Sequence, residues 1–105
     1  MVRRNSIEFK MSTIAKLVEI CASEFKTTPV AMQSKTRKQN VVFARHIAMY
    51  IMRNKYKMTY YSICFIFNRT HATAIHAIEN VENMVATDKF FREKFESILE
   101  QENNG

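Results

Sequence analysis

The chain has 105 residues, a length that suits one domain with a single hydrophobic core. Its 16 lysines and arginines outnumber 10 acidic residues and give a net charge of +6, which favours a polyanionic partner. The only glycine is Gly105 and the only proline is Pro29, so glycine-rich nucleotide loops are excluded and an all-α fold is favoured over a β-sandwich or barrel.

The first apolar pattern predicts an amphipathic helix over residues 12–26, preceded by a flexible lead-in of residues 1–10. Ser12 or Thr13 is the expected N-cap. The inward positions, three or four residues apart, are Ile14, Leu17, Val18, Cys21 and Phe25. Neither cysteine of the chain has disulfide or zinc-ligand spacing, so we expect reduced thiols and no metal site.

A short helix is predicted next. Thr28 is the expected N-cap, Pro29 suits the first turn, and the helix runs through Gln33. Residues 34–40 contain no apolar side chain that could anchor them, so they are predicted to form a basic loop. The bases of this loop are Lys35, Arg37 and Lys38.

Residues 41–55 return to the helical period. Their predicted core positions are Val42, Ile47, Ala48, Ile51 and Met52. The polar side chains of Arg45, His46 and Arg53 fall between these positions, and we expect them to share one flank of the helix.

The pattern after residue 58 predicts a helix-turn-helix. Residues 59–67 are rich in aromatics and fit either a short helix capped by Thr59 or a buried strand. Asn68 and Arg69 then form a tight connection to a longer helix at about residues 70–84. The apolar stripe of this longer helix is Ala74, Ile75, Ile78 and Val81.

A final helix is predicted over residues 88–101, with Thr87 or Asp88 as its cap and a frayed tail at residues 102–105. Its expected inward side chains are Phe90, Phe91, Phe95, Ile98 and Leu99. The outer face is acidic, so we expect it to point away from a polyanion. The fold predicted overall is a compact bundle of about five to six helices.

The positive charge is concentrated in the middle of the chain. Residues 25–78 contain no acidic side chain, whereas the two flanking parts carry ten between them. The bases in this stretch are Lys26, Lys35, Arg37, Lys38, Arg45, Arg53, Lys55, Lys57 and Arg69. Solvated faces usually mix both signs, so a block of one sign indicates a surface that binds a polyanion.

The second helix of the motif begins with short polar residues. Thr70, His71, Ala72 and Thr73 stand where a recognition helix presents side chains to base edges, and Arg69 suits a phosphate. His71 and His76 are five residues apart and therefore lie on different faces, which disfavours a metal site.

Three segments resemble the C-terminal DNA-binding domain of the bacterial replication initiator DnaA. They are Ser34–Arg37, Ala44–Tyr50 and Asn68–Ala77, and the resemblance covers about residues 11–101 in the same order. It implies a helix-turn-helix fold similar to that of the Trp repressor. It also implies sequence-preferring binding to double-stranded DNA in the control of replication or transcription.

The resemblance also implies roles for single residues. Arg37 would enter the minor groove from the basic loop, whereas His71, Ala72 and Thr73 would face bases in the major groove. Phosphates or the sugar backbone would be met by Arg45, His46, Arg53, Tyr60 and His76. Positive charge and position at the start of the second helix add four residues to this DNA-binding set, namely Lys35, Lys38, Arg69 and Thr70.

The chain departs from the family pattern at the positions that read bases. Thr70 replaces an acidic residue, Ala72 replaces a serine or threonine, and Ala74 replaces a valine. The turn of the motif lacks the usual glycines and is one residue shorter. Because the acidic side chain would accept from cytosine, the target sequence of the family is not expected to carry over.

The family's ATPase module has no counterpart, so we expect a free-standing domain, natural or excised, that is not an enzyme and needs no cofactor or nucleotide. Its expected location is the cytoplasm, on the nucleoid, in a bacterial or phage-encoded protein. The main alternative is a protein-interaction module for another replication or transcription protein. Its surface would use Tyr50, Tyr56, Tyr60, Tyr61 and several methionines, and a homo-oligomer stays open. Membrane-surface binding through residues 41–57 is disfavoured because Arg45 and Arg53 interrupt the apolar face.

Overall fold

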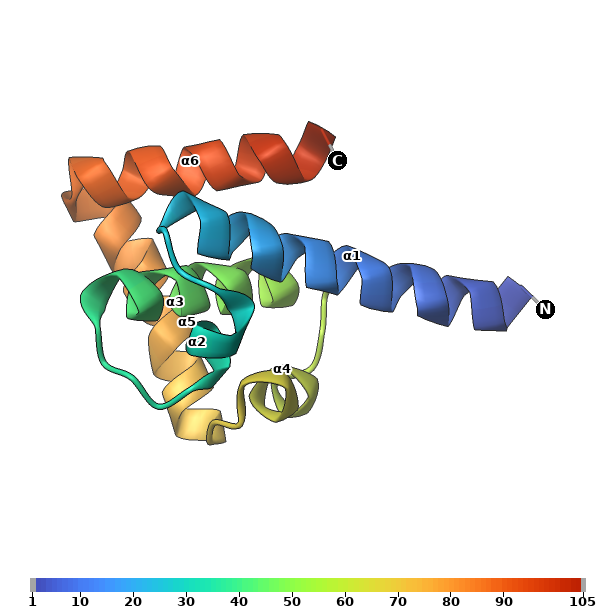
Figure 1. Cartoon of the computed structure of the whole chain (residues 1–105). Coiled ribbons are helices and arrows are strands. Elements are labelled where there is room, and N and C mark those ends of the chain that lie inside the picture. Colours follow the sequence, from blue (N-terminus) through green and yellow to red (C-terminus); the bar gives the residue numbers. More distant parts are fainter. Residues whose placement is uncertain (1, 105) are drawn as a thin grey trace.

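The computed structural model describes the backbone of residues 2–104 and the side chains of residues 11–104, and the backbone it describes contains helices and no strand (Figure 1). The helices are α1 (Val2–Glu24), α2 (Pro29–Gln33), α3 (Gln39–Asn54), α4 (Tyr60–Phe67), α5 (His71–Thr87) and α6 (Lys89–Asn104). The all-α prediction is confirmed, and the aromatic segment that fitted either a helix or a strand is the helix α4.

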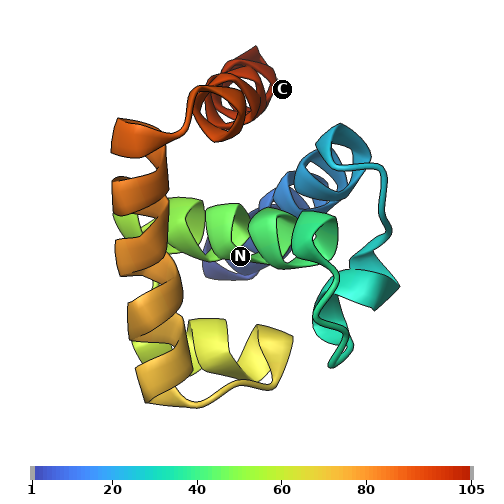
Figure 2. The ribbon, with the colours of Figure 1, turned by 90° about the vertical axis from the view of Figure 1, so that its left-hand side faces the viewer.

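Helix α3 lies at the centre of the bundle, packed against α1, α2, α4 and α5. Helix α6 packs against α1 and α5, and Figures 1 and 2 both show it at the end of α5 that lies away from α4. The core is apolar and tightly filled. Its largest fully buried side chains are Leu17, Met32, Ile47, Met49, Ile51, Met52, Ile63, Phe67, Phe91 and Ile98.

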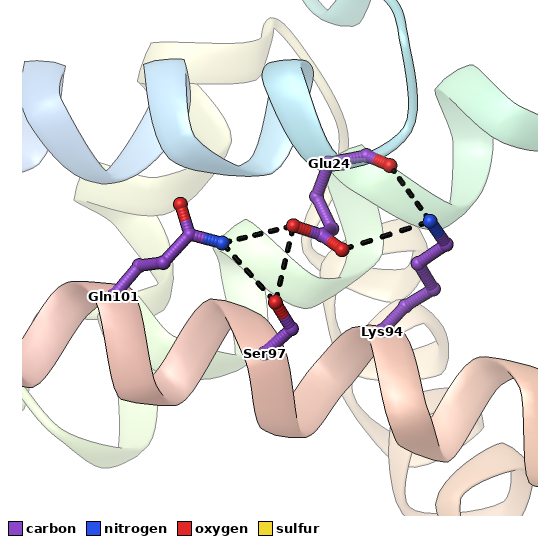
Figure 3. A network of polar contacts seen from close by, with 4 residues as sticks. All are labelled: Glu24, Lys94, Ser97 and Gln101. Carbon is purple, nitrogen blue, oxygen red and sulfur yellow. Dashed lines mark hydrogen bonds and ion pairs between the residues drawn. The ribbon is translucent and has the colours of Figure 1, made fainter.

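A polar network ties the end of α1 to α6 (Figure 3). The Glu24 carboxylate accepts hydrogen bonds from Ser97 Oγ at 3.2 Å and from Gln101 Nε2 at 2.8 Å. Lys94 Nζ lies 3.6 Å from the other carboxylate oxygen and donates to the Glu24 carbonyl at 3.3 Å. These contacts fix α6 along α1, on the side of the bundle away from the basic loop.

The two end helices are longer than the sequence patterns predicted. Helix α1 begins at Val2, so residues 2–10 are helical backbone and neither Ser12 nor Thr13 is its N-cap. No glycine or proline interrupts these residues. Helix α6 continues to Asn104 rather than fraying at residue 102, because Glu102 is buried and accepts from the Lys55 ammonium and the Tyr56 hydroxyl.

Two apolar residues predicted for the core are exposed. Phe90 is 59% exposed, since its neighbour Phe91 takes the inward direction and the Lys94 ammonium lies 5.5 Å from the Phe90 ring centre. Ile75 is 36% exposed, because Ala74 and Ile78 occupy the buried stripe of α5. Ile75 therefore lies on the surface of the predicted recognition helix.

The helix-turn-helix is formed by α4 and α5 and is fixed by side-chain caps. Thr59 Oγ1 accepts from Ser62 N at 3.1 Å, which starts α4, and Thr70 Oγ1 accepts from Thr73 N at 3.2 Å, which starts α5. Between them Asn68 adopts a left-handed conformation at φ 53°, and its N–H returns to the carbonyls of Cys64 and Phe65. Asparagine tolerates this conformation better than most residues, which explains how the turn forms without glycine.

Candidate nucleic-acid interface

The basic loop and the start of α5 lie side by side, although 35 residues separate them in the sequence. Arg69 Nη2, in the turn before α5, donates to the Ser34 carbonyl at 2.6 Å. Between the two segments is a surface pocket of about 600 Å³. Its lining residues are Lys35, Thr36, Arg37, Val42, Arg45, Asn68, Arg69, Thr70 and Thr73. This set includes four cations and no carboxylate, so the pocket suits an anion.

Hydroxyl groups and backbone amides fix the shape of the basic loop, which spans residues 34–38 in the structure. Ser34 Oγ donates to the Ala31 carbonyl at 2.6 Å and accepts from Thr36 N at 3.3 Å. Thr36 Oγ1 in turn accepts from Lys38 N at 3.3 Å. Lys35, Arg37 and Lys38 are exposed on this frame, as a DNA contact requires.

Arg45 has a different position from the one that the sequence predicts. It is only 5% exposed and lies beneath the basic loop rather than on an open flank. Its Nε donates to the Met32 carbonyl at 2.6 Å, and its Nη2 lies 3.2 Å from the Ser34 carbonyl and 3.4 Å from the Thr36 carbonyl. The hydrogen bonds of its guanidinium are therefore made to the loop backbone, and Arg45 supports the loop from beneath instead of lying on the open flank that the sequence predicts.

The first two turns of α5 present their predicted residues to solvent. His71, Ala72, Thr73 and His76 are all exposed, whereas Ala74 and Ala77 face the core. The hydroxyls of Thr70 and Thr73 bond each other at 3.0 Å, and Thr70 Oγ1 also caps the helix. Thr70 is therefore first of all a capping residue.

A second group of predicted residues meets where α3, α4 and α5 adjoin. The Arg53 guanidinium lies 4.3 Å from the centre of the Tyr60 ring, and Arg53 Nη1 donates to the Met58 carbonyl at 2.8 Å. The centre of the Tyr60 ring is 6.2 Å from the centre of the His71 ring. These contacts join the start of α4 to the start of α5 and keep a cation close to both.

His46 is half-buried on α3 and faces the side of α5 that carries Asn80. Its Nδ1 lies 3.4 Å from Asn80 Nδ2, and the two residues share a pocket of about 510 Å³ with Thr73 and His76. Burial, aided by the charges of Arg45 and Arg69, lowers the pKa of His46 to about 4. The imidazole is therefore neutral at pH 7 and serves as a hydrogen-bonding group rather than a cation.

Because the pKa of His46 is low in the folded chain, the fold should become less stable in acid. Protonation favours the unfolded chain, where the pKa is about 6.5, so this contribution is complete above pH 6.5 and is lost as the pH falls towards 4. At pH 5 we expect His46 to cost about 2 kcal/mol of unfolding free energy. Urea denaturation at pH 7 and pH 5 measures the loss, and His46→Gln should lose less. An equal loss in the variant would contradict this assignment.

Sequence reasoning missed three contributors to this surface. Asn80 lies next to the apolar Val81, and its position in the sequence does not mark it as the partner of His46. The spacing of Ile75 predicts a core position, but Ile75 is exposed. The Ser34 carbonyl accepts from two arginines. A backbone carbonyl leaves no mark in a sequence, so no pattern could have identified it.

Two properties of the described residues concern other kinds of site. No group of three or more histidine, cysteine, aspartate or glutamate side chains in this part of the chain is placed to hold a metal ion. Among residues 2–104, no helix combines the length and the apolar character that crossing a membrane requires.

Comparison with known proteins relates this chain to bacterial DnaA. Residues 14–81 match the family model described as the bacterial dnaA protein helix-turn-helix. The chromosomal replication initiator protein DnaA of Bacteroides thetaiotaomicron is 35% identical over 98 residues, which are 90% of this chain and 21% of the relative. DnaA of Flavobacterium psychrophilum is 36% identical over 87 residues, 82% of this chain and 18% of the relative. The chain thus spans about a fifth of the length of these relatives.

Proposed function

We propose a function for this chain from one premise: it belongs to the bacterial DnaA helix-turn-helix family. The chain binds double-stranded DNA with a sequence preference, as a part of replication or transcription control. The start of α5 enters the major groove, and the basic loop reaches the adjacent minor groove. The observation that carries this proposal is the cationic pocket between the loop and α5, which joins two DNA-reading elements in one surface.

The pocket fits the passage of a DNA strand. A sugar-phosphate strand separates the major groove from the minor groove, so a protein that reads both must pass a strand between its two reading elements. Lys35, Arg37 and Arg69 surround that space without a carboxylate, and the N-terminal amides of α5 add partial positive charge. A backbone phosphate is the anion that this arrangement suits.

The opposite end of the molecule carries a group of exposed carboxylates. Glu93, Glu96 and Glu100 are exposed on α6, which lies at the far end of α5 from the basic loop (Figure 1). A DNA duplex against the loop and the start of α5 would therefore stay away from these carboxylates. The charge distribution supports one orientation of the chain on DNA.

Base reading would come from exposed side chains on the first turns of α5. His71 and Thr73 offer hydrogen-bonding groups, and the methyl group of Ala72 can contact the methyl group of thymine. The exposed Ile75 adds an apolar contact one turn further along. This set is less polar than the family pattern and supports a target that differs from that of the relatives.

Selection of bound duplexes from a random pool tests the proposal directly. We expect a short enriched sequence with an A·T-rich flank, where the narrow minor groove attracts Arg37. Arg37→Ala should weaken binding and relax the preference at that flank alone. An equal loss on every duplex would mean that Arg37 contacts only phosphate, and a pool without enrichment would contradict sequence preference.

Changing Thr70 to aspartate should change the preferred sequence without unfolding the protein. Aspartate caps a helix as well as threonine does, so we expect the unfolding free energy to stay within about 0.5 kcal/mol. Its carboxylate accepts from the amino group of cytosine, so preference for one G·C pair should rise by about tenfold. Thr70→Asn keeps the cap without the negative charge and is the control. The same pool selection reads both variants, and an unchanged consensus for Thr70→Asp would contradict a base-facing position.

Binding to a protein is a second candidate function, supported by exposed apolar side chains on α1 and α4. Phe65 is 80% exposed and Met11 is 68% exposed, and both line an apolar groove of about 550 Å³ between these helices. Of the four tyrosines expected on such a surface, only Tyr61 is exposed, at 73%, and the other three are half-buried. Sedimentation over a range of concentrations tests self-association through this groove. Phe65→Ser removes an exposed apolar side chain of the groove and should reduce any self-association.

A further inference from the structure

We infer that Arg69 governs the specificity of DNA binding as a positioning residue, because it fixes the basic loop against the recognition helix. It would do so through the Ser34 carbonyl, so that the chain reads the two grooves in a single register. This inference rests on the proposed function and gives Arg69 a second task beside its charge near the DNA strand, which is to set the distance between the basic loop and α5.

The turn between α4 and α5 holds the Arg69 side chain in place. Arg69 Nη1 donates to the Phe67 carbonyl at 2.8 Å and lies 3.3 Å from the Asn68 carbonyl. Its Nη2 reaches the Ser34 carbonyl at 2.6 Å. The planar guanidinium thus bridges the end of α4 and the start of the loop, which a flexible single ammonium would not do in the same geometry.

Ser34 is the point where the supports of the loop converge. Its carbonyl accepts from Arg69 and also from Arg45 Nη2 at 3.2 Å. One residue earlier, Gln33 Nε2 donates to the Ile66 carbonyl of α4 at 2.9 Å. The end of α2 and the start of the loop are therefore tied to the helix-turn-helix by two side chains, Arg69 and Gln33.

The loop has little else to hold it beside α5. Lys35, Arg37 and Lys38 are exposed, and the bonds among Ser34, Thr36 and Lys38 lie within the loop itself. Arg45 supports the loop from α3 below and does not reach α5. A loop already ordered beside the recognition helix avoids an entropic cost when DNA binds, and only a fixed spacing lets one duplex satisfy both elements.

Arg69→Lys separates position from charge. The lysine keeps the positive charge, so we expect the affinity for a random duplex and its salt dependence to change little. Affinity for the selected duplex should fall about tenfold, the effect of losing well-aligned charged hydrogen bonds. Lys35→Gln is the matched control, since it removes a charge near the same pocket and should weaken both duplexes alike.

A second readout distinguishes positioning from a general loss of structure. Base changes are made in the minor-groove half of the selected duplex, in the major-groove half, and in both. For the native chain the two losses should be non-additive, because the halves are read by one rigid surface; for Arg69→Lys they should add. Gln33→Met removes the other contact between α2 and α4 without changing the charge. It should lower the affinity for the selected duplex, relative to a random duplex, by about threefold.

The possible failures have different meanings. If the native chain selects no sequence, the proposed function fails first. If it selects a sequence but Arg69→Lys keeps the same ratio of selected to random affinity, the inference about Arg69 is wrong and the proposed function stands. If thermal unfolding shows that Arg69→Lys does not fold, Gln33→Met decides the matter, and unchanged selectivity in that variant overturns the inference.

Discussion

Raising the salt concentration from 50 to 200 mM should weaken the binding of this chain to duplex DNA about 500-fold. The candidate interface holds five cations, Lys35, Arg37, Lys38, Arg53 and Arg69. If each neutralises one phosphate, the logarithm of the binding constant falls with the logarithm of salt concentration at a slope of about −4.5. The physical cause is release of counterions from the duplex. Fluorescence anisotropy with a labelled duplex at several salt concentrations measures the slope.

Two charge-removing variants show where the slope comes from. Lys35→Gln, in the pocket, should reduce it by about 0.9. Lys89→Gln removes an exposed charge at the start of α6, the other end of α5, and should leave it unchanged. A response that is flat with salt, or equal changes in both variants, would contradict a DNA interface at the loop and the start of α5.

Replacing Arg45 by methionine should lower the unfolding free energy by about 3 kcal/mol. Methionine has a similar length and suits a buried site, but it leaves the carbonyls of Met32, Ser34 and Thr36 without the donors that Arg45 supplies. The Met32 bond is buried, so its lost partner is not replaced by water. Chemical denaturation at pH 7 gives the change in stability.

Arg37→Met is the matched control for the buried arginine. Arg37 is exposed, so its loss should change stability by no more than about 0.5 kcal/mol while DNA binding falls. For Arg45→Met we expect the loss of stability to be the main effect. If Arg45→Met proved as stable as the native chain and merely bound DNA more weakly, the phosphate contact that the sequence suggested for Arg45 would be right and the supporting role wrong.

Most of the inner helix boundaries could be predicted because their causes are local. Thr28, Thr59 and Thr70 each cap the helix that follows them, and each cap is a hydrogen bond to an amide three residues away. The end of α6 could not be predicted in this way. It depends on the burial of Glu102 against Lys55 and Tyr56, which lie more than 40 residues earlier in the chain.

The candidate site shows the same division between local and long-range causes. Charge and spacing identified the exposed members, such as Arg37 and His71, because exposure follows from polarity. Arg45 has the same charge and a similar position in the pattern, yet it is buried, since the loop folds back over α3 and offers carbonyls to it. Whether an arginine supports a loop or meets a ligand depends on such tertiary contacts, which periodicity does not contain.

The separation of charge along α5 has a consequence for the speed of encounter with DNA. The basic loop lies at one end of this helix and the exposed carboxylates of α6 at the other, so we expect the folded chain to have an electric dipole along α5. In the field of a duplex this dipole turns the molecule before contact, and fewer collisions present the wrong face. Oriented approach of this kind can raise association rates by about tenfold or more at low ionic strength. The exposed carboxylates of α6, which lower the net charge, would thus help to aim the molecule as it diffuses.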